Sequence, residues 1–528
     1  MVFVDIELSD SYWESLEVSQ EDIEFLYAYL LEKEKPLPPE ELAAALVNER
    51  IRKEKQLLKE KQQSNGEIYL PENEYAVGDK VQFPAMNWIS GEVTDVREGN
   101  NPELPTLQVI TVALENDRKK QFAANIENHQ LNQAAMVQTD GDSEDDQAII
   151  EKFGDAITAA LEEKLDANKD LVRIGGNWFP KSLLIEFNVG HLNLAEAVLD
   201  MVGGGPLAVD DLLEQIQVDT DDPPELVRFS MNYALQEDPR FDEVGPRGIV
   251  KWFLNRLEPK NVRERPIELV FEPVEYDRSV LSEDMLIAEQ NLDDELTTPD
   301  PEFMRRKTNQ KDVAITLNYP HWRVGSIPLT AYTRPFFPTA IETPRVKLTL
   351  IDEEGDEISA WVVRPHNYVY GLREWYEEKE LMPGNIIHIK PGKNPGEVMI
   401  RPEPKRTNRE WIKTLLIGAD GGIVFAMLKQ TIAANFNERM AIAVPSTEVL
   451  DEIWQKRATN QRPIKQVMKA TMKELAKLNT QGQVHAVELY AAMNCIYRCP
   501  PGLVFSELAS NPDFAAVGDL YYRLGENS

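Results

Sequence analysis

The side chains that most often act as nucleophiles, proton carriers or metal ligands are sparse in this chain and spread along it. The six histidines occupy positions 129, 191, 321, 366, 388 and 485. No two of them have the H-x-x-x-H or H-E-x-x-H spacing that places two imidazoles on one helix face for zinc. Cys495 and Cys499 stand one helical turn apart without a second pair, so we interpret them as packing residues. We therefore expect no metal site and no cofactor.

Motifs typical of catalysis are weak. Residues 418–425 read GADGGIVF and lack the Gly-Lys-Ser/Thr ending of a phosphate-binding loop. Glu377-Glu378-Lys379 has the E-x-K form with which restriction-type nucleases hold a metal, but such a triplet arises easily by chance. We expect no catalytic residues and a protein that is not an enzyme, with a nuclease as the alternative.

A basic stripe runs through residues 463–478, PIKQVMKATMKELAKL. Its lysines recur every four residues, which places neighbours on one face of a helix. With the residue that precedes the segment, the basic residues are Arg462, Lys465, Lys469, Lys473 and Lys477. Val467, Met468 and Leu475 line the opposite, apolar stripe. This pattern predicts contact with nucleic-acid phosphates, and the alternative is a solvated surface whose lysines contact nothing.

Charge is distributed unevenly between the two halves of the chain. The 528 residues include 90 acidic and 56 basic side chains, a net charge of −34. The net charge is −37 over residues 1–300 and +3 over residues 301–528. Within the second part, residues 401–480 carry a net charge of +6. The whole protein is therefore too acidic to coat nucleic acid or an anionic membrane. The asymmetry predicts that the C-terminal half meets a polyanion, while the acidic half binds a partner or only keeps the protein in solution.

Apolar periodicity and turn residues predict a multidomain α+β protein with a small SH3-like barrel, winged-helix units and a pseudobarrel, joined by acidic linkers. Tyr75, Phe83 and Trp88 of the small barrel form either an aromatic binding patch or its core. The expected parts are a helical domain (1–64), the SH3-like barrel (65–135), a linker (136–147), a helical and winged-helix domain (148–260), a second linker (261–307), the pseudobarrel (308–402) and a C-terminal helical domain with a second winged-helix unit (403–528).

Two short segments echo one another. Asp238-Pro-Arg-Phe-Asp-Glu-Val-Gly245 matches Asn511-Pro-Asp-Phe-Ala-Ala-Val-Gly518, and each lies between a helical segment and an aromatic strand. The first copy, within residues 206–256, resembles the winged helix of the RNA polymerase delta subunit and the wider HARE helix-turn-helix family. The resemblance implies association with DNA or with the transcription machinery. Because Glu225, Glu237 and Asp238 make its expected recognition helix acidic, we expect this copy to contact protein.

Residues 313–400 carry a second pattern, with Phe337-Pro338, a turn at Asp352, Trp361 and Trp375 as landmarks. It resembles the DNA-binding pseudobarrel of plant auxin-response and abscisic-acid-response transcription factors, a fold shared with some restriction enzymes. The period-two alternation of VKLTLI and IIHIK agrees with strands. LREWYEEKEL (372–381) predicts a short helix that turns Leu372 and Trp375 inward.

The resemblance implies two arms that embrace the major groove of duplex DNA. It assigns the first arm to Tyr319–Arg323, with His321, Trp322 and Arg323, and the second arm to Arg364, His366 and Asn367. Arg334, Arg345 and Lys347 are the expected phosphate contacts near them. Arginine and asparagine are the side chains that pair bidentately with guanine and adenine edges. The region nevertheless sums to −2 over residues 311–400, so contact requires the DEEGDE turn (352–357) to lie away from the arms.

We interpret the chain as a non-catalytic DNA-binding protein of transcription or chromosome maintenance that contacts double-stranded DNA through its C-terminal half. The alternatives are an acidic scaffold bound to RNA polymerase through its N-terminal half, and a subunit of a restriction or defence nuclease. No apolar run reaches the ~20 residues that span a bilayer. We expect no membrane association and a cytoplasmic location, on the nucleoid if the source is bacterial.

Overall fold

A computed structural model describes most of the chain. The chain divides into two compact units. The described residues are 10–64, 67–83, 86, 89–101, 107–114, 118–127, 129, 132, 144–218, 220–301, 311–393, 397–418, 421–459 and 463–525. The first unit comprises Met1–Ile185 with Pro223–Phe229, and the second comprises Glu186–Asp222 with Ser230–Ser528. Among the described residues, no helix combines the length and the apolar character needed to cross a membrane.

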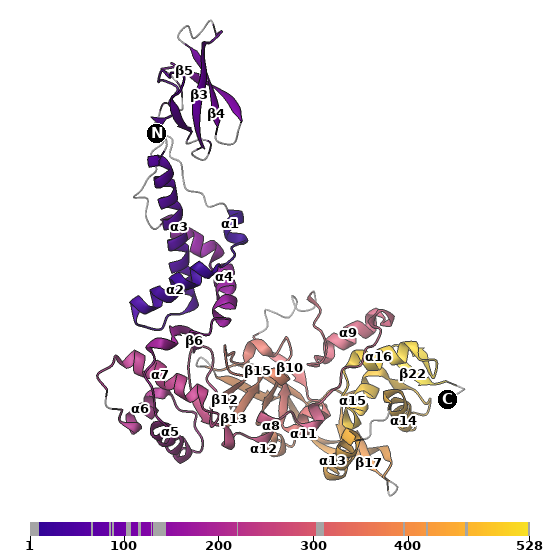
Figure 1. Ribbon diagram of the computed structural model, residues 1–528. Helices are drawn as coiled ribbons and strands as arrows, with labels where there is room; N and C mark the ends of the chain where they lie inside the picture. The colour runs from indigo at the N-terminus through magenta and orange to yellow at the C-terminus, as the bar shows by residue number, and fades with distance from the viewer. Residues whose placement is uncertain are drawn as a thin grey trace. The chain divides into compact units, whose positions relative to one another are not determined.

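Helices and one small sheet make up the first unit (Figure 1). The helical part consists of α1 (Asp10–Glu14), α2 (Gln20–Lys33), α3 (Pro39–Ser64), α4 (Glu144–Asp166) and the hairpin β6 (Leu171–Ile174) and β7 (Asn177–Pro180). Ser19 caps α2, and Asp22 completes the capping box. Leu26, Leu30 and Leu46 form part of the fully buried interface among these helices.

The small sheet has five strands in chain order. They are β1 (Glu67–Ile68), β2 (Lys80–Phe83), β3 (Ile89–Glu98), β4 (Gln108–Leu114) and β5 (Lys119–Ala124). Tyr75 and Phe83 are 6% and 3% exposed and belong to the core of this sheet, which leaves them no role as a surface patch. Trp88 lies outside the described residues.

Two segments of the second unit have the same order of elements. The first contains α5 (Val189–Met201), α6 (Val209–Ile216), α7 (Pro224–Glu237), β8 (Phe241–Glu243) and β9 (Trp252–Leu254), and its α7 crosses the boundary between the units. The second contains α14 (Ile464–Ala476), β20 (Val484–His485), α15 (Ala486–Ile496), α16 (Pro501–Ser510), β21 (Phe514–Gly518) and β22 (Tyr521–Leu524). We call them the first and second repeats.

The sequence echo corresponds to the same turn in both repeats. The backbone N–H of Arg240 donates to Asp238 Oδ1 at 3.0 Å, and that of Asp513 donates to Asn511 Oδ1 at 3.0 Å. An aspartate or asparagine that bonds the backbone two residues on is a turn former. A strand follows each turn and pairs with the last strand of its repeat. The two matching segments therefore form the same kind of turn.

A further backbone pairing lies beside the last strand of each repeat, as an isolated bridge in the first repeat and as the strand β20 in the second. Leu207 and Trp252 exchange backbone hydrogen bonds of 3.1 and 2.8 Å, and Val484 pairs with Tyr522 at the equivalent place. The helix after this pairing also starts alike, because an acid at its third position accepts from the N-cap backbone in both copies. The likeness thus covers both the strand pairing and the helix starts.

Between the repeats lies a curled, half-barrel sheet of seven strands in the order β10-β15-β16-β12-β13-β14-β11. Its elements are β10 (Val313–Thr316), α11 (Tyr319–Val324), β11 (Ser326–Pro328), β12 (Arg345–Ile351), β13 (Glu357–Val363), β14 (Tyr368–Tyr370), α12 (Arg373–Glu378), β15 (Ile386–Pro391) and β16 (Val398–Pro402). Leu372 and Trp375 are 0% and 3% exposed, so the predicted inward face is confirmed. Gly325 ends α11 at φ +77°, where a Cβ would come within 2.6 Å of the Arg373 backbone nitrogen.

Residues 404–443 contain a three-stranded sheet where the sequence analysis expects helices. The strands are β17 (Pro404–Ile417), β18 (Ile423–Ala434) and β19 (Ile442–Ala443), and α13 (Thr447–Thr459) follows. β17 and β18 pair along almost their whole length through a turn at Gly418–Gly422. Helix-forming residues such as Met427, Leu428 and Lys429 obscured the strand pattern, and the long pairing overrides their local preference.

The segment expected to be the second acidic linker is also ordered. It contains α8 (Lys260–Arg263) and α9 (Glu283–Leu292), with single turns at 267–269 and 278–280. Met285 is buried in the core of the second repeat, and α9 packs against α16. Two acids of this segment are paired, Glu289 with Arg278 of the same segment and Asp294 with Arg498 of the second repeat.

Candidate nucleic-acid interface

The first predicted arm is a packed helix. Asn318 caps α11, and Tyr319, Pro320 and His321 are buried. His321 Nδ1 lies 2.8 Å from Ser326 Oγ, and its Nε2 lies 3.1 Å from Glu295 Oε2. Both ring nitrogens of His321 therefore face groups of the protein, Nδ1 in a hydrogen bond with Ser326 and Nε2 close to the carboxylate of Glu295.

The other two residues of this arm also bond within the chain. The indole N–H of Trp322 donates to the Leu381 carbonyl oxygen at 2.7 Å. Arg323 Nε donates to Asp451 Oδ1 of α13 at 2.8 Å, and its side chain is 24% exposed. Hydrogen bonding to Asp451 raises the pKa of Arg323 above its ordinary value. A phosphate would have to displace Asp451 to reach this guanidinium.

The cations of β12 face the first repeat. Arg345 pairs with Asp242 and, at 2.9 Å, with Glu258 Oε2. Lys347 Nζ lies 4.6 Å from the centre of the Trp361 ring and donates to Ser359 Oγ at 3.0 Å. Burial lowers the pKa of Lys347. Both side chains join the sheet to the first repeat.

The second predicted arm leaves more of its side chains open. Beside this arm, the expected phosphate contact Arg334 is exposed, and its guanidinium donates to Asn367 Oδ1 of the arm at 2.8 Å. Arg364 donates to the Thr343 carbonyl oxygen at 2.6 Å. The ring of His366 stacks on Tyr368, and burial lowers the pKa of His366. The structure thus brings Arg334, Arg364 and Asn367 to one place.

The two predicted arms leave opposite ends of one strand pair. One arm precedes β11 and the other precedes β14, and these strands are antiparallel. The acidic turn at 352–356 joins β12 to β13 at the end away from Arg345 and Arg364. There Lys379 Nζ contacts Glu354 at 2.7 Å and Asp352 at 3.2 Å. The turn therefore lies away from the second arm, and Lys379 of the E-x-K triplet is paired with it.

The basic stripe lies on α14, the first helix of the second repeat. Lys465 Nζ lies 3.3 Å from Glu507, Lys469 lies 3.4 Å from Asp513, and Lys477 lies 2.7 Å from Glu474. Lys473 is exposed and has no ion pair among the described residues. Arg462 lies outside the described residues. The buried Met468 and Leu475 confirm the predicted apolar stripe.

An exposed basic face that the sequence analysis did not single out lies on β17 and β18. Arg409 and Lys429 are exposed and lie on the same face of the hairpin as Trp411, because Trp411 pairs directly with Lys429. Trp411 is 60% exposed. Within the described part of the chain, neither Arg409 nor Lys429 has a carboxylate within ion-pairing distance. The net charge of +6 over residues 401–480 was the feature of the sequence that indicated a basic surface in this region.

A groove of about 620 Å³ opens beside this face. Trp411 and Lys413 line it from β17, Arg439 from the loop before β19, and Tyr521 from β22. Lys413 Nζ donates to Glu488 Oε1 at 2.6 Å, and burial lowers the pKa of Lys413. The groove therefore combines aromatic rings with cationic side chains.

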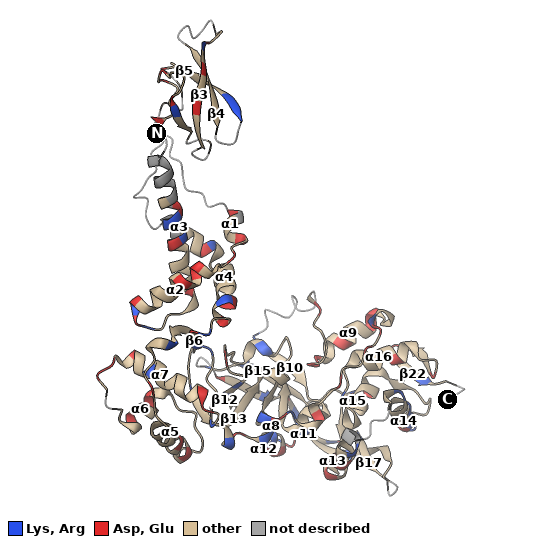
Figure 2. Ribbon diagram, viewed as in Figure 1, with Lys and Arg blue, Asp and Glu red and all other residues tan. Residues whose placement is uncertain are grey.

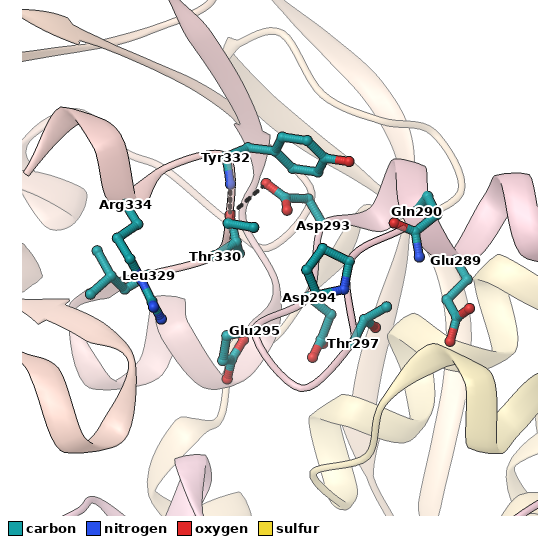
Figure 3. A pocket seen from close by; sticks show the side chains of 12 residues that line it. Glu289, Gln290, Asp293, Asp294, Glu295, Thr297, Leu329, Thr330, Tyr332 and Arg334 are labelled. Carbon is teal, nitrogen blue, oxygen red and sulfur yellow. Dashed lines mark hydrogen bonds between the residues drawn. The ribbon is translucent and has the colours of Figure 1, made fainter. Parts of the chain in front are cut away.

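A smaller hollow of about 180 Å³ lies between α9 and the loop after β11 (Figure 3). Thr330 Oγ1 donates to Asp293 Oδ2 at 3.0 Å. The neighbouring Asp294 is bound by Arg498 through two hydrogen bonds of 2.8 and 2.9 Å, and Arg498 also reaches Glu295 at 2.7 Å. Burial opposes ionisation of Glu295, but the charge of Arg498 holds its pKa below the usual range. These bonds join the segment after α9 to the loop after β11 and to the second repeat, so the residues around the hollow have a structural role.

Comparison with known proteins returned no assignment. No protein-family model matches the chain, and no curated protein matches it.

Proposed function

We propose that the chain is a non-catalytic DNA-binding protein of transcription or chromosome maintenance, and that its C-terminal half contacts duplex DNA. The observation that supports this most directly is the pair of exposed cations, Arg409 and Lys429, on one face of β17–β18. Arg406 is also exposed on β17, and Figure 2 shows how the basic and acidic residues are spread over the elements of the chain. Cations without internal partners can neutralise phosphates and release counterions, which favours binding.

The predicted arms take a secondary place in this proposal. Arg323 and Arg345 already pair with carboxylates, and a phosphate would gain less from them than from a free cation. Arg334 is exposed and bonds Asn367 instead of a carboxylate, which favours a further contact by its guanidinium. We therefore assign the main phosphate contact to the hairpin and a supporting one to the second arm.

We propose further that both repeats are winged helices, in line with their element order. In the second repeat the third helix, α16, is buried along most of its length against α9 and α15. A buried helix has no face for a DNA groove. Its role in this proposal is to support the hairpin surface.

Binding of a fluorescent blunt duplex to the full chain tests the proposal. We expect Arg409→Glu with Lys429→Glu to weaken binding by on the order of tenfold or more at moderate salt. Lys119→Glu with Lys120→Glu is the matched control, because it reverses two exposed charges on β5 and changes net charge equally. Equal losses of duplex affinity in the two double variants would show that the effect comes from net charge alone. No binding by the unaltered chain would remove the proposal.

A second candidate function is an acidic scaffold bound to RNA polymerase. The exposed apolar side chains of α5 favour it, since Val189, Leu194 and Met201 are 68%, 50% and 87% exposed. Exposed apolar residues on one helix are typical of protein contacts. Binding of purified RNA polymerase to nuclease-treated chain, compared with Leu194→Glu plus Met201→Glu, separates this candidate from DNA binding. Loss of the complex only in the variant would favour the scaffold.

A further inference from the structure

We propose that the groove beside Trp411 holds an unpaired nucleobase of single-stranded or bulged nucleic acid. This inference rests on the proposed function and names the substrate feature that the same surface selects. Its elements β17, α14 and β22 belong to the orange and yellow part of Figure 1, and the groove is lined by residues of all of them or of their adjoining loops.

Three aromatic residues line this groove, Trp411, Phe436 and Tyr521, and each ring has a cation beside it. Lys429 Nζ lies 5.5 Å from the centre of the Trp411 ring, and the Arg439 guanidinium lies 5.4 Å from that of Tyr521. Nucleic-acid bases stack on aromatic rings and on guanidinium planes in proteins that bind single strands. The 60% exposure of Trp411 leaves an open stacking surface.

Polar side chains at the rim suit the edges of a base. Asn479, Thr480 and Gln483 line the groove from the segment between α14 and β20. Amides and hydroxyls both donate and accept, so they can pair with the Watson–Crick edge of any base. These edges are free only in an unpaired base, which is why the site selects unpaired nucleotides over a blunt duplex.

The charge balance of the groove is compatible with a nucleotide. Three acids line it, but Glu410 pairs with Lys405 at 2.8 Å and Glu488 pairs with Lys413 at 2.6 Å. Glu438 is exposed and has no ion pair among the described residues. Arg409 lies two residues along β17 from Trp411, on the same face of the hairpin. A strand whose base stacks on Trp411 would thus keep its phosphate near a free cation.

The volume distinguishes this groove from the hollow beneath α9. At about 620 Å³ it lies within the range of sites for ligands of nucleotide size. The hollow beside Asp293 has about 180 Å³, and Arg498 already neutralises two of its carboxylates. Only the groove at Trp411 combines room, open aromatic surface and free cations among the described residues.

Competition binding with the full chain tests the inference. The probes are a blunt DNA duplex, the same duplex with an unpaired thymidine bulge, an oligothymidine strand and an oligouridine strand. We expect the bulged duplex to bind more tightly than the blunt one. In Trp411→Ala the ratio of bulged to blunt affinity should fall by roughly five- to a hundredfold, the loss expected for one base–aromatic stack. Trp411→Phe should retain most of the preference for the bulged duplex, because an aromatic ring remains for stacking.

The outcomes separate the two proposals. Failure to bind any probe overturns the proposed function and the inference with it. Binding of the blunt duplex without preference for the bulge, or a preference that Trp411→Ala leaves intact, overturns the inference alone. Tight binding of oligouridine but not oligothymidine would make RNA the source of the base, and the reverse would make it DNA.

Discussion

Arg498 shows how much a single side chain can contribute to this protein. It is fully buried and binds Asp294 and Glu295, which lie about two hundred residues earlier in the chain. A buried carboxylate without its partner is strongly destabilising, because neither water nor a cation compensates its charge. The joint between α9 and the second repeat therefore depends in part on this guanidinium, beside the Tyr490 hydroxyl that also donates to Asp294 and the buried Met285.

Replacing Arg498 by methionine should lower the free energy of unfolding of the second unit by about 3–5 kcal/mol. Urea denaturation measures this loss. Arg256→Met is the control, because its bond to Asp200 joins two half-exposed side chains and should cost less than about 1 kcal/mol. Similar losses in the two variants would contradict the assigned role of Arg498.

At the scale of elements, the contact between the first repeat and β12 is rich in charged side chains. Asp242, Glu243 and Glu258 approach it from the repeat, and Arg345, Lys347 and Glu342 approach it from the sheet. Burial raises the pKa of Glu243 to about 8, and the nearby charges of Glu342 and Asp242 add to this rise. A proton is therefore held at this contact at neutral pH.

We expect Glu243→Gln to reduce the sensitivity of this contact to alkali. The folded pKa of Glu243, about 8, lies above its unfolded value of 4.5. The stability it contributes is full below pH 4.5 and is lost as pH rises through about 8. A tenfold difference in proton affinity between the folded and unfolded chain corresponds to about 1.4 kcal/mol, so the effect on the free energy of unfolding is at most a few kcal/mol.

Thermal denaturation between acidic and alkaline pH measures this difference. The variant should gain melting temperature over the unaltered chain above pH 8, and the gain should vanish below pH 4.5. Glu342→Gln is a useful comparison, because it removes only a neighbouring charge. A gain that is the same at every pH would contradict the proposed protonation of Glu243.

For the whole molecule, net charge and local charge act in opposite directions. The chain carries −34 overall, so its average field repels DNA. Contact must come from a patch where cations lack internal partners. Arg409 and Lys429 form such a patch on one face of β17–β18, and Arg406 is exposed farther along β17. Other cations of the second unit, such as Arg345, Lys465 and Arg498, are paired with carboxylates of the same unit.

The salt dependence of duplex binding should reflect this small patch. Three neutralised phosphates predict a slope of log affinity against log salt of about −3, from roughly 0.9 per phosphate. Arg409→Glu with Lys429→Glu should bring the slope to about −1. A fluorescence titration over a range of salt measures both slopes. A slope that the double variant leaves unchanged would place the phosphate contacts elsewhere.

Local features of this protein could be predicted from the order of its residues alone, because they depend on neighbours within a few positions. The Ser19 cap, the turns at Asp238 and Asn511, and the inward faces of Leu372 and Met468 follow from such short spacings. The predicted α+β class follows from the same patterns.

Which charges stay free, by contrast, depends on how the chain folds. Arg323 pairs with Asp451, 128 residues away in the sequence, and Arg498 pairs with Asp294, 204 residues away. No local sequence pattern predicts either ion pair. The hairpin β17–β18 is likewise stabilised by strand pairing that overrides helix-forming residues. A cation binds a phosphate only if folding leaves it without a carboxylate, so the location of the candidate interface became visible only in the folded chain.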